Sequence, residues 1–332
     1  MQPTFPLLRL PLDERLAVLQ QTETIHLFVL SLISKRSKNL VTSANRKAKA
    51  VVVSVERRIK FLCQMFQDPG FDIELSIRKT PNEPNKVKKP EYVNILQNSP
   101  NDTLITCTKE EYEVKDWLDH LCQIFHRKDH RLYIELHGSR YDFDSVYEHF
   151  KNPSILKLHI TRNTDYDNRV LKMIIPKRSL SLDMRVFENE QHPKHILIQN
   201  YDSFECFGDF EALRWASSLD DLLCANSRLV GTIVSGFSEK DINKFLKLWI
   251  HGSNPRLQQL VLMPSSFDYD VVLRGIQNFI LREDQEKVFK TVIEPFEYIV
   301  KGGREIRRMD GTVGRIVINN EGESFDFFIW HE

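Results

Sequence analysis

The sequence predicts an α/β protein: a short all-α module, then an irregular leucine-rich-repeat-like α/β domain that ends in an antiparallel β-meander. Three observations support this prediction. The first forty residues place apolar side chains at helical spacing, the middle of the chain alternates between helix-like and strand-like segments, and the stretch beyond Pro295 alternates with a period of two. We expect three parts, at residues 1–50, 51–295 and 296–332.

Composition excludes several classes of protein. The 332 residues carry 46 basic and 46 acidic side chains, and this balance argues against a nucleic-acid partner. The five cysteines form no CxxC pair, which argues against a disulfide framework or a zinc site and favours a reducing compartment. The longest apolar run, at 24–34, is shorter than the roughly 20 residues that span a bilayer. With no secretory signal visible, we expect a cytoplasmic or nuclear protein with no membrane contact, metal or cofactor.

The N-terminal forty residues predict three helices. Leu12, Leu16 and Leu19 recur at i, i+4 and i+7 on one side of a helix that starts after Pro11. The segment 24–34 is apolar almost all round, and a basic helix follows it. A module of about 40 residues is too small to bury such a helix. Part of its apolar surface must therefore pack on the rest of this chain or on a second protein, and the pattern leaves both alternatives open.

A basic run follows these helices. Between residues 35 and 60 the cationic side chains, Arg57 and Arg58 among them, outnumber the acidic ones. We interpret this run as the solvated face of one or two helices; phosphate binding or nuclear import is the alternative. A polar, proline-rich loop is expected at residues 80–90.

Two stretches in the middle of the chain echo each other, FLCQMF at 61–66 and HLCQIF at 120–125. Each is interpreted as the end of a helix, followed by a strand at 71–77 or at 132–137. Further strands are expected at residues 155–160, 195–199, 232–235 and 260–263, with a helix at 141–150 before the first of them. Spacings of roughly 30 to 40 residues fall within the range of repeat periods, so we expect a mostly parallel sheet.

The C-terminal region contains the clearest local signals. Ser238 and Asp241 predict a capping box for a helix that ends before His251-Gly252. Its buried stripe is predicted to consist of Ile242, Phe245, Leu246 and Trp249. Strands are expected at residues 296–300, 304–309, 312–319 and 324–330, with hairpin turns at Gly302-Gly303, Asp310-Gly311 and 320–322.

The N-terminus resembles an F-box, through the segment FPLLRLP at 5–11, Leu16, LSL at 30–32 and SKRSK at 34–38. More narrowly, it is similar to the F-box proteins expanded in nematodes. The resemblance implies a three-helix module whose apolar surface docks on the Skp adaptor of a cullin–RING ubiquitin ligase. By the same resemblance the adaptor contacts would be Leu10, Pro11, Leu16, Leu19, Ile25, Phe28 and Leu32.

A second resemblance covers the C-terminal part. Residues 239–257, 273–276, 310–312 and 328–330 resemble the F-box-associated domain of the same families, most strongly from about residue 200. The resemblance implies a non-catalytic substrate receptor that captures a target protein, without naming the target. The alternative is an α/β repeat scaffold without a ubiquitin role, whose N-terminal helices dock internally.

Motifs of enzymes are absent from the sequence. No GxxxxGK[ST], HExxH or GxSxG segment occurs. His192 and His195 flank a proline that disfavours a helical metal pair, and Asp220 and Asp221 are adjacent residues that point in different directions on a helix. Neither pair predicts a catalytic site.

Four arginines near the C-terminus are the candidate target-binding residues: Arg304, Arg307, Arg308 and Arg315. Guanidinium groups on a glycine-containing hairpin suit a phosphate or an acidic peptide. The alternatives are a hairpin with solvated arginines and, in a third class, a phosphate-directed enzyme or a nucleic-acid binder.

Overall fold

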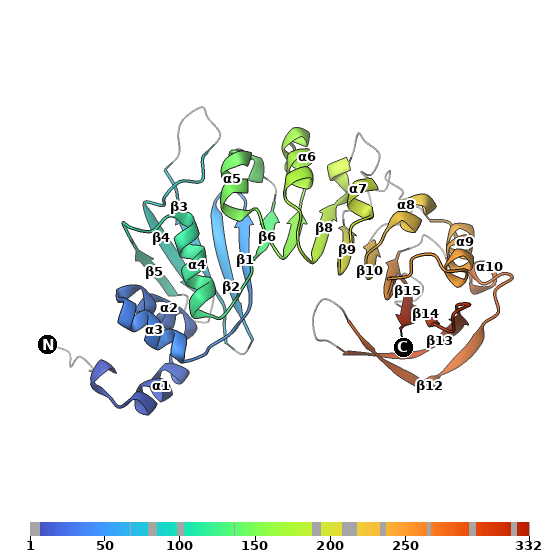
Figure 1. Cartoon of the computed structure of the whole chain (residues 1–332), viewed down its shortest axis with the longest axis horizontal. Helices are drawn as coiled ribbons and strands as arrows, with labels where there is room; N and C mark the ends of the chain where they lie inside the picture. The colour runs from blue at the N-terminus through green and yellow to red at the C-terminus, as the bar shows by residue number, and fades with distance from the viewer. Residues whose placement is uncertain are drawn as a thin grey trace. The chain divides into compact units, whose positions relative to one another are not determined.

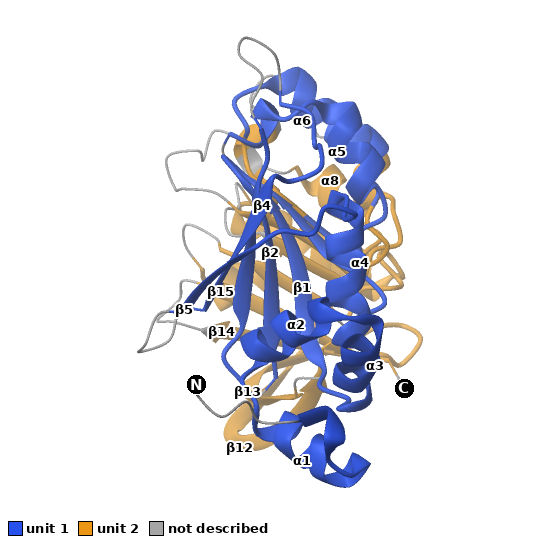
Figure 2. Ribbon diagram, turned by 90° about the vertical axis from the view of Figure 1, so that its left-hand side faces the viewer, with its two compact units in different colours: residues 1–156, 161–175 blue, residues 157–160, 176–332 orange. Residues whose placement is uncertain are grey.

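A computed structural model describes residues 7–66, 68–78, 85–97, 103–135, 137–187, 194–207, 218–232, 237–263, 267–291, 297–319 and 324–331. The chain divides into two compact units, shown in different colours in Figure 2. Unit 1 comprises Met1–Leu156 and Thr161–Ile175, and unit 2 comprises Lys157–Ile160 and Pro176–Glu332. Neither residue 50 nor residue 295 separates the units. The N-terminal helices belong to the same unit as the strands that follow them.

Unit 1 combines helices with a largely antiparallel sheet (Figure 1). Its helices are η1 Leu7–Arg9, α1 Leu12–Gln21, α2 Thr24–Ile33, α3 Lys35–Ser43, α4 Val114–Ile124, η2 Gly138–Arg140, α5 Phe143–Phe150 and α6 Thr164–Met173. Its strands are β1 Ala48–Val55, β2 Ile59–Met65, β3 Phe71–Ser76, β4 Tyr92–Gln97, β5 Thr103–Cys107 and β6 Arg131–Ile134. Strands β1 to β5 pair antiparallel in chain order, while β6 pairs parallel with β1. The unit boundary runs through β7 Ile155–Leu158.

The two echoing stretches have different structures. Residues 120–124 end helix α4 as predicted, whereas 61–65 belong to strand β2, so the prediction of a helix there is wrong. In β2, Phe61 and Cys63 are buried and alternate with more accessible residues, which is the period of a strand. In α4, a capping box between Glu113 and Asp116 fixes the helix start. The basic run after α3 likewise enters strand β1, not a second helix.

Unit 2 begins with parallel strands and ends with antiparallel ones. Its elements are β8 Ser179–Asp183, η3 Met184–Phe187, α7 Lys194–Leu197, β9 Ser203–Phe207, α8 Leu219–Cys224, β10 Leu229–Thr232, α9 Glu239–Ile250, β11 Gln259–Leu262, α10 Tyr269–Val272, β12 Phe279–Lys290, β13 Glu297–Arg307, β14 Val313–Asn319 and β15 Ser324–Trp330. Strands β8 to β11 pair parallel in chain order, and β15, β14, β13 and β12 follow β11 antiparallel. The predicted fold class is confirmed: N-terminal helices precede a mixed α/β region that ends in antiparallel strands.

Helix α9 anchors the core of unit 2 as the sequence predicts. The Ser238 amide donates to Asp241 at 3.2 Å and the Asp241 amide donates to Ser238 at 3.3 Å, which completes the capping box. The four residues of the predicted stripe are buried. The ring of Trp249 lies 4.9 Å from that of Phe327 in β15. Burying side chains of this size contributes about 1.5–3 kcal/mol each.

Two further predictions in unit 2 need correction, and one strand was missed. Residues 195–197 form helix α7, not a strand. Strand β13 runs unbroken through Gly302-Gly303, whose φ angles of 54° and 94° bend the strand where a hairpin was expected. Strand β12, which pairs with β13, was not predicted. Of the predicted strand at 232–235, Thr232 ends β10, and 233–235 lie outside the described residues.

Candidate protein-binding surfaces

The N-terminal helices begin where the sequence provides start signals. Pro11 precedes α1, and Asp13 and Glu14 place negative charge in its first turn, where the helix dipole favours it. Ser34 separates α2 from α3 and accepts a hydrogen bond from the Ser37 amide at 3.1 Å. The three predicted helices are therefore present, and their packing decides which side chains a partner could reach.

Helix α2 packs into the interior of unit 1, and Figure 2 shows it beside the strands β1 to β5 with α3 and α4. The Phe28 ring has no exposed surface. Its centroid lies 5.3 Å from that of Phe71 in β3 and 6.4 Å from that of Trp117 in α4. The strands and α4 therefore cover much of the apolar helix that the sequence left uncovered.

Burial changes the role of four predicted adaptor contacts. Their exposed fractions range from 0% to 8%: Leu19, Ile25, Phe28 and Leu32. A side chain enclosed by its own chain offers no surface to a second protein. We therefore correct these four from adaptor contacts to core residues of unit 1.

A buried chain of hydrogen bonds joins α2 to α4. The Ser31 hydroxyl lies 2.7 Å from Nε2 of His120, whose Nδ1 lies 2.9 Å from the Tyr112 hydroxyl. Ser31 also donates to the Phe28 carbonyl at 2.5 Å, so its oxygen is left to accept from Nε2–H. Burial, assisted by nearby lysine charges, lowers the pKa of His120 to about 3, and the ring stays neutral. These bonds lock α2 to the body of unit 1.

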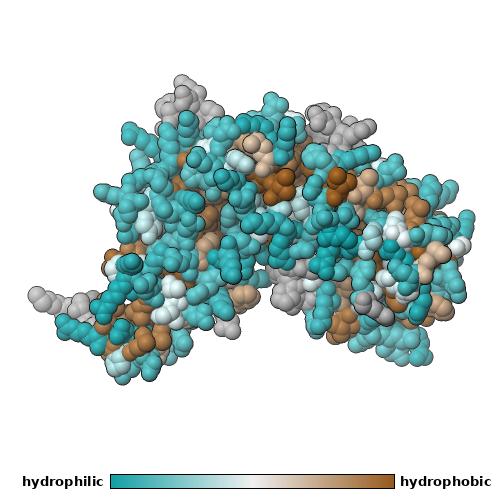
Figure 3. All heavy atoms as spheres, in the orientation of Figure 1, coloured by the Kyte–Doolittle hydropathy of each residue, from teal (hydrophilic) through white to brown (hydrophobic). Residues whose placement is uncertain are grey.

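Another apolar surface stays open around α1, where Figure 3 shows hydrophobic side chains at the surface. We call this surface the N-terminal apolar face and define it by Leu8, Leu10, Pro11, Leu12 and Leu16. Leu8 and Leu12 have exposed fractions of 38% and 55%, Pro11 is exposed, and Leu10 and Leu16 are half-buried. Residues 12 and 16 share one side of α1 because they are one turn apart.

Three of the predicted adaptor contacts, Leu10, Pro11 and Leu16, therefore lie on a surface that a partner can reach. Leu8 and Leu12 join them and were not among the predicted contacts. Exposed apolar patches of this kind mark interaction sites in soluble proteins.

Two of the four candidate arginines in unit 2 have structural roles. Arg315 is 5% exposed, and its Nη1 donates to the carbonyls of Gln285 and Val300, both at 3.0 Å. Arg308 is 8% exposed, and its Nη2 donates to the Gly252 carbonyl at 2.6 Å. Because these guanidinium groups already donate to backbone oxygens, we correct Arg308 and Arg315 from target-binding residues to structural residues: Arg315 ties β14 to β12 and β13, and Arg308 holds the turn after α9.

The other two arginines are more accessible but also have partners. Arg307 pairs with Glu305 at 3.1 Å, and the Arg304 guanidinium lies 5.1 Å from the ring centroid of Tyr269. The four arginines therefore do not form one accessible cationic patch, because Arg308 and Arg315 are buried.

Of the residues weighed for catalysis, Asp221 has a structural role. Asp221 accepts from the Ser218 amide at 2.9 Å in the capping box of α8. His192 lies outside the described residues. In the part of the chain that the structure describes, no three His, Cys, Asp or Glu side chains gather as metal ligands would. Over that same part, no helix combines the length and the apolar character that crossing a membrane requires.

Unit 2 contains a groove that the sequence did not reveal. Its volume is about 600 Å³, and its lining comes from β11 to β15: Gln259, Glu283, Tyr298, Ile299, Val300, Lys301, Val317, Ile318, Asp326 and Phe328. Phe328 points to the opposite face of β15 from Phe327, which packs on α9. Tyr298 and Ile299 are 51% and 60% exposed. Because β12 and β13 were not recognised as a pair, the groove that they help to form was not predictable.

Two protein families match parts of the chain. The F-box domain matches residues 7–49, and an F-box-associated family matches residues 192–262. An F-box associated domain-containing protein of Caenorhabditis elegans, sdz-33, is 25% identical over 221 residues, which cover 66% of this chain and 65% of that protein. No solved structure matches the chain. Both resemblances predicted from the sequence are confirmed.

Proposed function

Because the chain carries an F-box domain at residues 7–49 and an F-box-associated domain at residues 192–262, we propose that it is the substrate receptor of a Skp–cullin–F-box-type ubiquitin ligase. F-box proteins are generally non-catalytic adaptors, and we assign this chain no chemistry of its own. The observation that supports the proposal best is the N-terminal apolar face. It lies inside the matched F-box region and remains open although α2 is buried.

In this proposal a Skp-type adaptor covers the N-terminal apolar face and links the chain to a cullin–RING ligase in the cytoplasm or nucleus. Burying a leucine contributes about 1.5–3 kcal/mol, so a few such residues suffice for a stable contact. The buried hydrogen bond between Ser31 and His120 holds the N-terminal helices against the rest of unit 1. The receptor would then act by raising the effective concentration of its target near the ubiquitin-charged enzyme.

An α/β scaffold without a ubiquitin role is the second candidate. It is favoured by the burial of Leu19, Ile25, Phe28 and Leu32, since internally docked helices are what that candidate requires. The two candidates differ in one respect. Only the receptor needs the residues that remain exposed on η1 and α1.

Binding to a purified Skp-type adaptor separates the two candidates. In the double variant Leu8→Glu/Leu12→Glu we expect adaptor affinity to fall at least about a hundredfold, because two apolar contacts become buried charges. The melting temperature should change little, because both side chains are exposed. Leu104→Glu is the matched control, since Leu104 lies on β5 with an exposed fraction of 63%.

Isothermal titration and thermal unfolding of the three proteins give the readout. Adaptor binding that survives in the double variant, or that is absent in the wild-type chain, would favour the scaffold. Equal loss in Leu104→Glu would show a general effect of added charge.

A further inference from the structure

Two parallel strands of unit 1, β1 and β6, bring their carboxyl ends to one edge. Their pairing runs from Val52 with Arg131 to Val55 with Ile134. The segments that leave these ends are tied together within unit 1: the Glu135 amide donates to the Val55 carbonyl at 3.0 Å, and the Ser139 hydroxyl donates to the Thr161 carbonyl at 3.4 Å. Ligands of α/β sheets bind outside the carboxyl ends of parallel strands.

The backbone at this edge has a specific, constrained shape. A Cβ atom on Gly138 would lie 2.9 Å from the Val55 carbonyl oxygen, so only glycine allows the start of η2 to approach the end of β1 so closely. His137 and Arg162 both adopt left-handed φ angles, of 74° and 64°. Such residues cluster at binding sites, where the surrounding structure holds them in place.

The segments that meet at this edge carry three arginines: Arg57 lies two residues after Val55, Arg140 two residues after Gly138, and Arg162 directly after Thr161. The pKa of His137 is lowered, first by desolvation and then by the positive charges of these three side chains. All three are exposed. Among the described residues none of them forms an ion pair with a carboxylate. The neighbouring Arg58, in contrast, pairs with Glu74.

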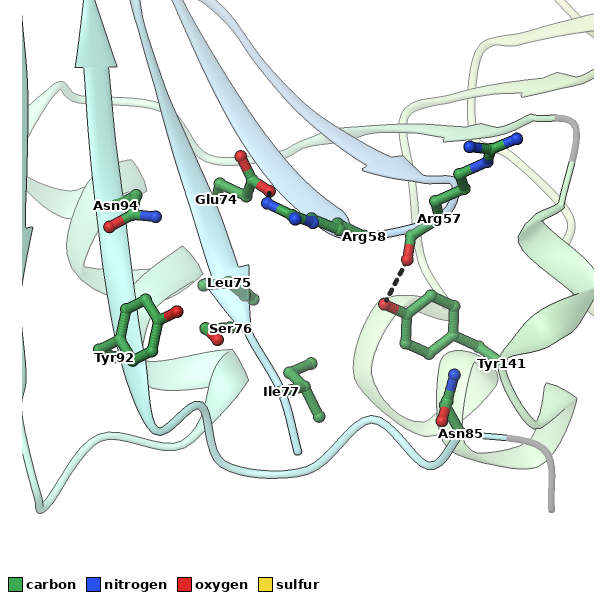
Figure 4. Close-up of a pocket in the computed structure, with 10 residues that line it drawn as sticks. All are labelled: Arg57, Arg58, Glu74, Leu75, Ser76, Ile77, Asn85, Tyr92, Asn94 and Tyr141. Atoms are coloured by element: carbon green, nitrogen blue, oxygen red, sulfur yellow. Dashed lines mark hydrogen bonds and ion pairs between the residues drawn. The ribbon is translucent and has the colours of Figure 1, made fainter. Parts of the chain in front are cut away.

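A small polar pocket adjoins the cluster (Figure 4). Its volume is about 160 Å³, and its lining includes Asn85, Tyr92 and Asn94. The Tyr141 hydroxyl donates to the Arg57 carbonyl at 3.4 Å and so holds the turn between β1 and β2. Figure 4 shows the Arg57 side chain directed away from the Arg58–Glu74 pair. At this size the pocket is below the roughly 300–1,000 Å³ of sites that hold drug-sized ligands, and it suits one side chain.

We propose that Arg57, Arg140 and Arg162 bind an oxyanion, either a phosphate or a carboxylate, on an extended segment of a protein partner. A neighbouring side chain of that segment would enter the small polar pocket that Asn85 helps to line. Guanidinium groups bind phosphate and carboxylate through paired, charge-assisted hydrogen bonds, and phosphate carries the larger charge. The identification of this partner as a ubiquitination target rests on the proposed function. The oxyanion site itself does not. In this proposal these three arginines, and not the four arginines near the C-terminus, bind the target.

Fluorescence anisotropy of the full chain tests this site. The probes are three labelled nonapeptide pools, degenerate except for a central phosphoserine, aspartate or serine. We expect the phosphoserine pool to bind at least tenfold more tightly than the serine pool, with the aspartate pool between them. In the triple variant Arg57→Gln/Arg140→Gln/Arg162→Gln this preference should disappear.

The matched control is Lys240→Gln/Lys247→Gln/Arg274→Gln, which removes the same charge from exposed positions in unit 2. We expect it to bind the phosphoserine pool like the wild type. Equal affinity for all three pools, or equal loss in both triple variants, would overturn the inference. So would tighter binding of single-stranded nucleic acid or of phosphatidylserine vesicles than of the phosphoserine pool.

Adaptor binding distinguishes a failure of this site from a failure of the proposed function. We expect the arginine triple variant to bind the Skp-type adaptor as the wild type does. If the wild-type chain does not bind the adaptor but keeps its phosphoserine preference, the oxyanion site stands and the ligase role falls.

Discussion

Phe28 and Leu12 show how neighbours determine the role of a single apolar side chain. Phe28 meets an aromatic ring from β3 and another from α4, and has no surface left. Leu12 starts α1 and keeps 55% of its surface. The two residues have similar hydrophobicity, so only the positions of later elements of the chain separate a core residue from a contact residue.

His120 gives the residue-scale prediction. Its pKa is about 3 in the folded chain against the ordinary 6.5 when unfolded. A depressed histidine pKa makes the unfolded state bind the extra proton, so stability is complete above pH 6.5 and is lost as the pH falls toward 3. The expected slope approaches 1.4 kcal/mol per pH unit. Urea unfolding at several pH values should show a shallower slope for His120→Gln.

Parallel pH profiles for the wild type and His120→Gln would contradict this prediction. They would mean that the ring titrates in the folded chain, and that the bonds to Ser31 and Tyr112 do not hold it neutral.

Arg308 and Arg315 show what the sequence could not reveal at this scale. Their spacing and the nearby glycines are typical of an anion site. Their actual partners are backbone carbonyls from residues that are distant in the chain, such as Gly252 for Arg308. Every residue has a backbone carbonyl, so the sequence does not show which carbonyl an arginine will bind. Side-chain patterns therefore cannot distinguish a buried structural arginine from a binding arginine. The arginines near His137 were invisible for the opposite reason, because only the fold brings them together.

Elements were predictable where local signals agreed. Helix α9 has a capping box, a complete apolar stripe and a glycine stop, and all three are present in the structure. The segments 61–66 and 120–125 have similar sequences, but the first lies largely in strand β2 and the second ends helix α4. A strand in contact with neighbours on both sides overrides weak helical periodicity.

The bend of β13 gives the prediction at this scale. Gly303 has a φ of 94°, and a Cβ added there would lie 2.3 Å from the Ile316 carbonyl oxygen. Gly311 has a φ of 93° but has nothing within 4 Å. Both alanine variants suffer the backbone strain of about 1–2 kcal/mol, and only Gly303→Ala adds a clash with the backbone of β14.

We expect Gly303→Ala to lower the free energy of unfolding by at least about 2 kcal/mol more than Gly311→Ala does, as measured by urea unfolding. Equal losses in the two variants would mean that the β13–β14 pair moves apart without cost. The close approach at Gly303 would then not hold the bend.

At the scale of the whole molecule, the division into parts differs from the one that the sequence suggested. Strand-like and helix-like periods change near residues 50 and 295, but contacts group the N-terminal helices with β1 to β6 and the meander with β8 to β11. The sequence posed internal docking and partner binding as alternatives. In the structure α2 docks internally on unit 1, whereas α1 and the turn before it keep an apolar surface that a partner could reach.

Hydrogen exchange of the full chain, with and without a purified Skp-type adaptor, tests the central claim most directly. We predict that amides of α2 are already protected in the free chain, through its packing on β3 and α4. Amides of residues 8–20 should exchange faster and gain protection when the adaptor is added. Fast exchange in α2 of the free chain, or no gain at residues 8–20, would contradict the assignment of α2 to the core and of the N-terminal apolar face to the adaptor.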